Sequence, residues 1–138
     1  LDIKVEKHRI FEGTSNIEEF KSFINKTDAV MIIPEPTLLR KENLLKEILT
    51  FLQENKKPIL AYHQLFLDYG AVLIVSADNP TTRRQTSTMI NGFSDEFEDV
   101  DKVQYPAGTK IIFNKKEADR IGLDYSQSVL YISNEVVE

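Results

Sequence analysis

Glu35 and Thr37 lie beside two prolines, directly after the apolar run 28–33. A carboxylate and a hydroxyl in such a loop can hydrogen-bond the polar groups of a small ligand. The prolines stiffen the loop, which lowers the entropic cost of presenting those groups. The alternative interpretation is that the prolines end a strand and the polar residues begin the next helix. We keep Glu35 and Thr37 as candidate ligand contacts.

His63 and Gln64 follow a second apolar run, 58–62. His63 can donate a hydrogen bond to a carboxylate or carbonyl, although an ordinary exposed loop histidine fits the pattern as well. Apolar runs without alternation are typical of strands in a parallel sheet that is covered on both faces. Ligands bind outside the carboxyl ends of such strands. We therefore expect the two polar loops to converge along one rim of the molecule.

Tyr69 and Asp78 border the third apolar run, 70–76. Tyr69 either lines a cleft at the strand ends or seals the core. Asp78 precedes Asn79 and Pro80, a pattern typical of a helix N-terminus with an acidic cap. Both residues complete the set of candidate ligand contacts.

Several kinds of chemistry find no support in the sequence. The chain has no cysteine, which excludes disulfides, thiolate nucleophiles and zinc–thiolate sites. Its five glycines are too scattered for a phosphate-binding loop. His8 and His63 are too far apart to form a helical metal motif. We therefore expect a protein that is not an enzyme, with no catalytic residue, no metal site and no cofactor.

The composition predicts one globular domain. A chain of 138 residues with 41% hydrophobic and 28% charged residues can bury a core without covalent staples. The net charge of −5 disfavours nucleic acid and anionic lipid as partners. No apolar run reaches the length of a membrane-spanning helix.

Strands and helices are predicted to alternate along the chain. This alternation predicts right-handed crossovers and a three-layer α/β/α sandwich. The sheet should be mainly parallel and flavodoxin-like, with about five strands, and the core should be formed by residues 1–76 and 104–123. The strands are expected at 3–11, 28–33, 58–62, 70–76 and 110–113, and the helices at 15–24, 41–55 (or from 38), 80–97 and 115–121.

Three segments, 27–34, 57–85 and 104–123, together resemble the substrate-binding proteins of ABC transporters with the periplasmic binding protein type I fold. The second segment carries Lys57-Pro58-Ile59-Leu60-Ala61 and then Asp78 and Arg84-Gln85, with Arg83 where the family usually has glycine. The third ends in the run from Asn114 to Leu123. The resemblance covers nearly the whole chain but departs in length, because such proteins have two lobes and about twice as many residues.

The resemblance implies that residues 1–138 form a single ligand-binding lobe. Its function would be non-catalytic, extracytoplasmic binding of an amino-acid-like small molecule for an ABC-type transport system, with Asp78 near a ligand ammonium group. The implied partners are the ligand and a membrane permease. The implied location is periplasmic or extracellular, with membrane association through segments outside this chain.

The same lobe could instead be the extracytoplasmic sensor domain of a signalling receptor, such as a histidine kinase or a cyclic-dinucleotide enzyme, whose signalling domain lies outside this chain. The helix at about 79–98 would belong to the other lobe of a two-lobed protein. Without that lobe, we expect its apolar stripe to pack on the sheet or on a second copy in a homodimer.

Overall fold

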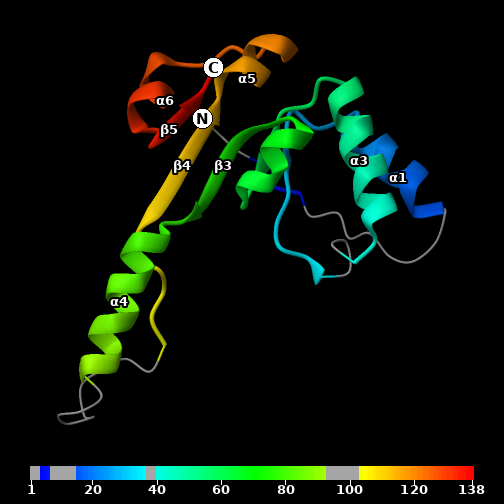
Figure 1. Cartoon of the computed structure of the whole chain (residues 1–138). Coiled ribbons are helices and arrows are strands. Elements are labelled where there is room, and N and C mark those ends of the chain that lie inside the picture. Colours follow the sequence, from blue (N-terminus) through cyan, green and yellow to red (C-terminus); the bar gives the residue numbers. More distant parts are fainter. Residues whose placement is uncertain (1–3, 7–14, 37–39, 93–102) are drawn as a thin grey trace.

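The computed structural model describes residues 4–6, 15–36, 40–92 and 103–138, with only the backbone for residues 15 and 16. Helices and strands alternate over most of this length (Figure 1). In chain order the elements are α1 (Ser15–Ile24), β1 (Val30–Met31), α3 (Glu42–Glu54), β2 (Ile59–Ala61), the 3-10 helix η1 (Gln64–Tyr69), β3 (Ala71–Ala77), α4 (Asn79–Gly92), β4 (Thr109–Asn114), α5 (Lys115–Ile121), α6 (Gln127–Ile132) and β5 (Glu135–Val137).

The five strands form one mostly parallel sheet in the order β1-β2-β3-β4-β5. Three neighbouring pairs are parallel, and only β3 and β4 run antiparallel. The carboxyl ends of β1, β2 and β3 therefore lie at one edge of the sheet, and β4 begins at that same edge. The fold is the predicted α/β class, a flavodoxin-like sheet flanked by helices.

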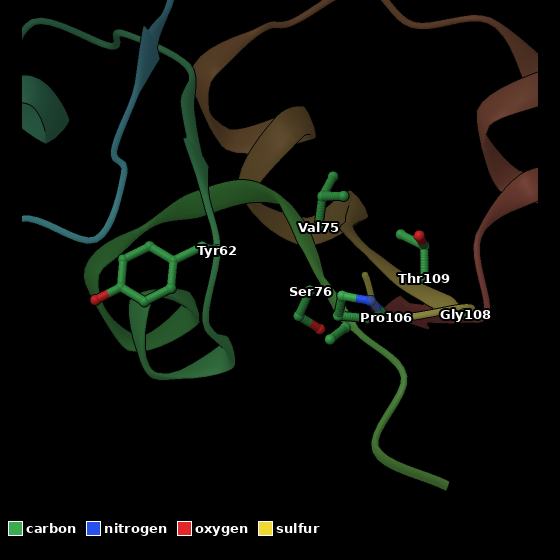
Figure 2. Close-up of a pocket in the computed structure, with 7 residues that line it drawn as sticks. Tyr62, Val75, Ser76, Pro106, Gly108 and Thr109 are labelled. Carbon is green, nitrogen blue, oxygen red and sulfur yellow. The ribbon is translucent and has the colours of Figure 1, made fainter. Parts of the chain in front are cut away.

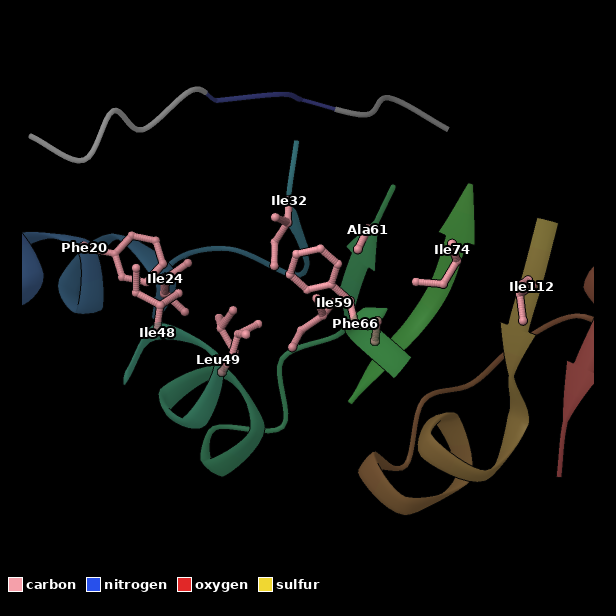
Figure 3. Close-up of a cluster of buried hydrophobic side chains, with 12 residues drawn as sticks. Phe20, Ile24, Ile32, Ile48, Leu49, Ile59, Ala61, Phe66, Ile74 and Ile112 are labelled. Carbon is pink, nitrogen blue, oxygen red and sulfur yellow. The ribbon is translucent and has the colours of Figure 1, made fainter. Parts of the chain in front are cut away.

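One face of the sheet carries the main hydrophobic core. Ala61, Ile74 and Ile112 are direct neighbours across β2, β3 and β4, and they are 3%, 0% and 1% exposed. Helices α1 and α3 cover this face, because their apolar residues fall on one side of each helix. Figure 3 shows these helical side chains beside those of the strands: Phe20, Ile24, Ile48 and Leu49.

The opposite face is covered at the end of the sheet near β4 and β5. Phe113 lies in the row of Leu60 and Leu73 on that face and is buried. Its ring packs edge-on against Tyr125, between α5 and α6, with 4.9 Å between ring centroids. At the far end of the same row, Met31 of β1 is 66% exposed. This second layer is therefore partial among the described residues.

Helix α4 extends beyond the ends of β3 and β4 instead of packing on the sheet (Figure 1). None of its residues is buried. The apolar stripe expected on this helix comprises Thr86, Met89, Ile90, Phe93 and Phe97. Of these, Met89 is half-buried and Ile90 is 62% exposed. Phe93 and Phe97 lie outside the described residues.

The observed elements correct the sequence prediction at both ends of the chain. The strand expected at 3–11 falls mostly outside the described residues, and Lys4–Glu6 have no regular structure. Conversely, α6 and β5 were not predicted, because six and three residues are too few to show a periodic pattern. Every helix in the described part of the chain is too short or too polar to cross a bilayer.

Candidate functional site

An open hollow of about 380 Å³ lies at the edge of the sheet where β2 and β3 end and β4 begins (Figure 2). The strand ends contribute Tyr62, Val75, Ser76 and Ala77. The segment that returns from α4 contributes Pro106 and Gly108, and Thr109 opens β4. The volume is within the range of about 300–1,000 Å³ that is typical of small-molecule sites.

The antiparallel pairing of β3 with β4 builds one wall of the hollow. Val75 lies opposite Ile111, and Ala77 lies opposite Thr109. Since β3 ends where β4 begins, two stretches far apart in sequence present side chains next to each other. The hollow therefore depends on the one strand pair that departs from the parallel arrangement.

The lining of the hollow is apolar with a few hydroxyl groups. Val75, Ala77 and Pro106 supply aliphatic surface, and Ser76 and Thr109 supply hydroxyls. None of the seven residues that line the hollow is charged. Such a surface can bind an uncharged, partly apolar group and hydrogen-bond its polar atoms. No three His, Cys, Asp or Glu side chains gather as metal ligands anywhere in the described residues.

Asp78, predicted as a helix cap or a ligand contact, caps α4 in the structure. Its carboxylate accepts a hydrogen bond from the backbone N–H of Thr81 at 3.0 Å and another from the Thr81 hydroxyl. These hydrogen bonds hold the pKa of the Asp78 carboxyl below its usual value, and the one from the Thr81 hydroxyl has the largest effect. Asp78 also donates its own N–H to the carbonyl of Gly108 at 2.9 Å. Asp78 thus joins the segment that leads from β3 into α4 to the segment that returns from α4 to β4. It lies beside the hollow and does not line it.

The segment 103–108 is fastened to α4 by one glutamine. Nε2 of Gln85 donates to Oε1 of Gln104 and to the carbonyl of Tyr105, both at 3.0 Å. Oε1 of Gln85 accepts from the backbone N–H of Ala107 at 3.1 Å. These three hydrogen bonds join the middle of α4 to the segment 103–108, which leads back to β4.

His63 and Gln64 lie at the carboxyl end of β2, the edge of the sheet that holds the hollow. Nδ1 of His63 accepts the backbone N–H of Leu65 at 3.1 Å, so this residue is the N-cap of η1. Both side chains are exposed, and neither lines the hollow.

The remaining predicted contacts also lie outside the lining. Glu35 is exposed and follows β1, at the same edge of the sheet as the hollow. Thr37 lies outside the described residues. Tyr69 is half-buried and packs against the main core, the sealing role that the sequence left open.

The predicted contacts Glu35, His63 and Gln64 lie at the edge of the sheet that holds the hollow, but no predicted contact in the described residues is among those that line it. Tyr62 and Ser76 fall in the apolar runs expected as buried strands, and Pro106 and Thr109 fall in the segment 104–123 of the family resemblance; none of the four is a predicted ligand contact. The signal that could have found these residues is the order of the elements. The chain leaves the sheet before α4 and re-enters it afterwards, so the two segments that connect α4 to the sheet must lie close together. The antiparallel pairing that brings them together was not predicted.

The comparisons with known proteins give structural similarity only. No family model and no curated protein matches the sequence. One similar structure is a conserved domain protein from Vibrio cholerae O1 biovar El Tor, with a TM-score of 0.61 and 18% identity. Another is the ABC domain in complex with L-Trp from Streptococcus pneumonia, with a TM-score of 0.61 and 22% identity.

Both similar structures are much longer than this chain. The match to the Vibrio protein covers 84% of this chain and 38% of the other, and the match to the Streptococcus protein covers 87% and 40%. This chain thus spans less than half of each. At such identities the likeness shows a shared fold alone.

Proposed function

We propose that this chain is a ligand-binding lobe that takes an amino-acid-like small molecule in the hollow at the ends of β2 and β3. The observation that carries the proposal is the place of the hollow, where the strand ends and the two crossing segments meet. The uncharged, partly apolar lining fits the uncharged side chain of an amino acid, whose ammonium and carboxylate groups would stay at the open side of the hollow, in water. The Streptococcus structure in complex with L-Trp, of the same fold, supports this ligand class.

We further propose that binding serves import through an ABC-type transporter, outside the cytoplasm, and that no chemical step follows. The open hollow would bind the ligand weakly on one side, and a second body would enclose the other side. This chain is shorter than both similar structures. That difference fits a site whose two sides are supplied by two bodies. Recovery of the ligand unchanged after incubation, checked by mass spectrometry, tests the absence of turnover.

A pair of matched variants tests the hollow as the binding site. Ala77 and Ala107 are both exposed, but only Ala77 lines the hollow. Ala77→Phe should fill it and abolish binding of uncharged L-amino acids in isothermal titration calorimetry, whereas Ala107→Phe should bind as the wild type does. Equal binding by both variants would place the ligand elsewhere.

The transport role needs a separate measurement in cells. Deletion of the gene should lower uptake of the radiolabelled amino acid that binds best, and the Ala77→Phe variant should fail to restore it. If binding is real but uptake is unchanged in the deletion strain, the sensor interpretation replaces transport. Signalling output would then respond to the same amino acid.

A further inference from the structure

We propose that Tyr62 is the residue that selects the ligand, and that the hollow prefers amino acids with a flat aromatic side chain over aliphatic or charged ones. This inference rests on the proposed function and assigns the ligand class. Tyr62 is the one aromatic side chain among the lining residues. Its ring stands on one side of the hollow, and Ser76 and Pro106 lie across from it (Figure 2).

The ring of Tyr62 packs against a buried residue of the hydrophobic core. It packs at a tilt of 58° against Phe66, with 5.6 Å between centroids, and Phe66 is 3% exposed. A buried phenylalanine cannot move aside without opening the core, so it fixes the ring above it. A ring that is already fixed loses little entropy when a ligand stacks on it.

His63 holds the same ring from the side. The two rings meet edge to face at 61°, with 6.4 Å between centroids. His63 is itself fixed, because its Nδ1 accepts the N–H of Leu65. The residue predicted as a ligand contact thus acts as a positioning residue for Tyr62.

The Tyr62 ring, and not its hydroxyl, serves the hollow. In Figure 2 the hydroxyl is directed away from Ser76, Pro106 and Thr109. An aromatic ligand would gain an aromatic pair with Tyr62 and apolar contact with Val75 and Pro106 on the other side. A charged side chain would lose water without gaining an opposite charge from the lining.

The test compares four ligands, L-tryptophan, L-phenylalanine, L-leucine and L-lysine, by calorimetry on the full chain. The chain contains no tryptophan, so a change in the indole fluorescence of L-tryptophan also reports its binding without an indole signal from the protein. The two aromatic ligands should bind about three- to tenfold more tightly than L-leucine, the range expected for one aromatic pair. L-lysine should bind most weakly.

Two variants separate the ring from the hydroxyl. Tyr62→Phe should keep the preference, and Tyr62→Leu should remove it by weakening L-tryptophan and L-phenylalanine about three- to tenfold more than L-leucine. Tyr131→Leu, at an 85% exposed tyrosine that does not line the hollow, is the matched control and should change nothing. An equal loss of all ligands in Tyr62→Leu would overturn the inference.

A measurement on the wild type covers the case in which Tyr62→Leu does not fold. Addition of L-tryptophan should shift the NMR signals of the Tyr62 ring protons more than those of the other four tyrosines. Unmoved Tyr62 signals at saturation would overturn the inference. Binding of all four ligands with equal affinity would overturn it and leave the proposed function standing. Absence of any binding would overturn both.

Discussion

The carboxylate of Asp78 accepts two hydrogen bonds from Thr81, one from the backbone N–H and one from the hydroxyl. This pair closes the first turn of α4, and the N–H of Asp78 ties the same turn to the carbonyl of Gly108. Gly108 allows this approach, since a Cβ there would lie 2.9 Å from Cβ of Thr81. The segment that leads from β3 into α4 and the segment that returns to β4 are therefore held together at this point.

Replacing Asp78 by alanine should lower the melting temperature by roughly 2–5 °C, because the first turn of α4 loses its cap. The ligand should still bind, since Asp78 does not line the hollow. Thermal unfolding followed by circular dichroism measures the first effect and calorimetry the second. Asn79→Ala, one residue along and exposed, is the control. Loss of binding with an unchanged melting temperature would instead make Asp78 a ligand contact.

The same cap predicts a dependence of stability on pH. The hydrogen bonds from Thr81 lower the pKa of Asp78 in the folded protein relative to the unfolded chain. The stabilisation is thus fully present above the unfolded pKa of 3.8 and disappears as the pH falls through the lower, folded value. Urea unfolding should show the wild type more stable than Asp78→Asn at neutral pH, and the difference should shrink below about pH 4. A constant difference down to pH 2 would contradict the assignment.

Gln85 should control the order of the segment 103–108. Gln85→Ala removes three hydrogen bonds to that segment, including the one from the N–H of Ala107. Amide hydrogen exchange at Ala107 should become about five- to tenfold faster, the effect expected for one lost hydrogen bond. Thr88→Ala is the matched control, because the Thr88 hydroxyl donates only to the Arg84 carbonyl within α4. Unchanged exchange at Ala107 in Gln85→Ala would show that other contacts order the segment.

The central strands could be predicted from the sequence because their signal is strong and local. The apolar run after Gly70 became β3, and the run after Pro58 became β2. The ends of α5 carry a local signal of the same kind, since Asn114 accepts the N–H of Glu117 and Gly122 ends the helix at a φ of 73°. Such signals need only neighbours within one turn of the chain.

The hollow could not be predicted because it depends on contacts between distant segments. His63 has the same sequence context whether it binds a ligand or caps η1, and only the position of Leu65 decides between them. The ring of Tyr62 gains its role from Phe66 below it and from the segment around Pro106, which lies more than forty positions away. The pairing of β3 with β4 brings these two segments together. The sequence of neither strand indicates whether that pairing is parallel or antiparallel.

Lys57 should contribute to stability through one partly buried hydrogen bond. Its Nζ donates to the carbonyl of Thr27 at 2.6 Å and so links the entry of β2 to the end of α1. Lys57→Met keeps the length of the side chain but leaves that carbonyl without this donor, so the free energy of unfolding should fall by about 1–2 kcal/mol. Lys56→Met, at the exposed neighbour, should have little effect. Equal stabilities of the two variants in urea would show that water replaces the lysine.

Gly70 and Gly122 share one backbone conformation, so replacing each by alanine distinguishes the cost of backbone strain from the cost of steric crowding. Gly70 and Gly122 have φ values of 78° and 73°, which favour glycine. A Cβ at Gly122 meets nothing within 4 Å, whereas one at Gly70 would lie 2.7 Å from Nε2 of Gln53 and 2.8 Å from Oε1 of Glu117. That carboxylate is already bound by Arg120. Gly122→Ala should therefore cost about 1 kcal/mol in urea unfolding, and Gly70→Ala roughly 2–3 kcal/mol. Equal costs would mean that Gln53 and Glu117 move aside freely, so that the backbone alone sets the penalty at both sites.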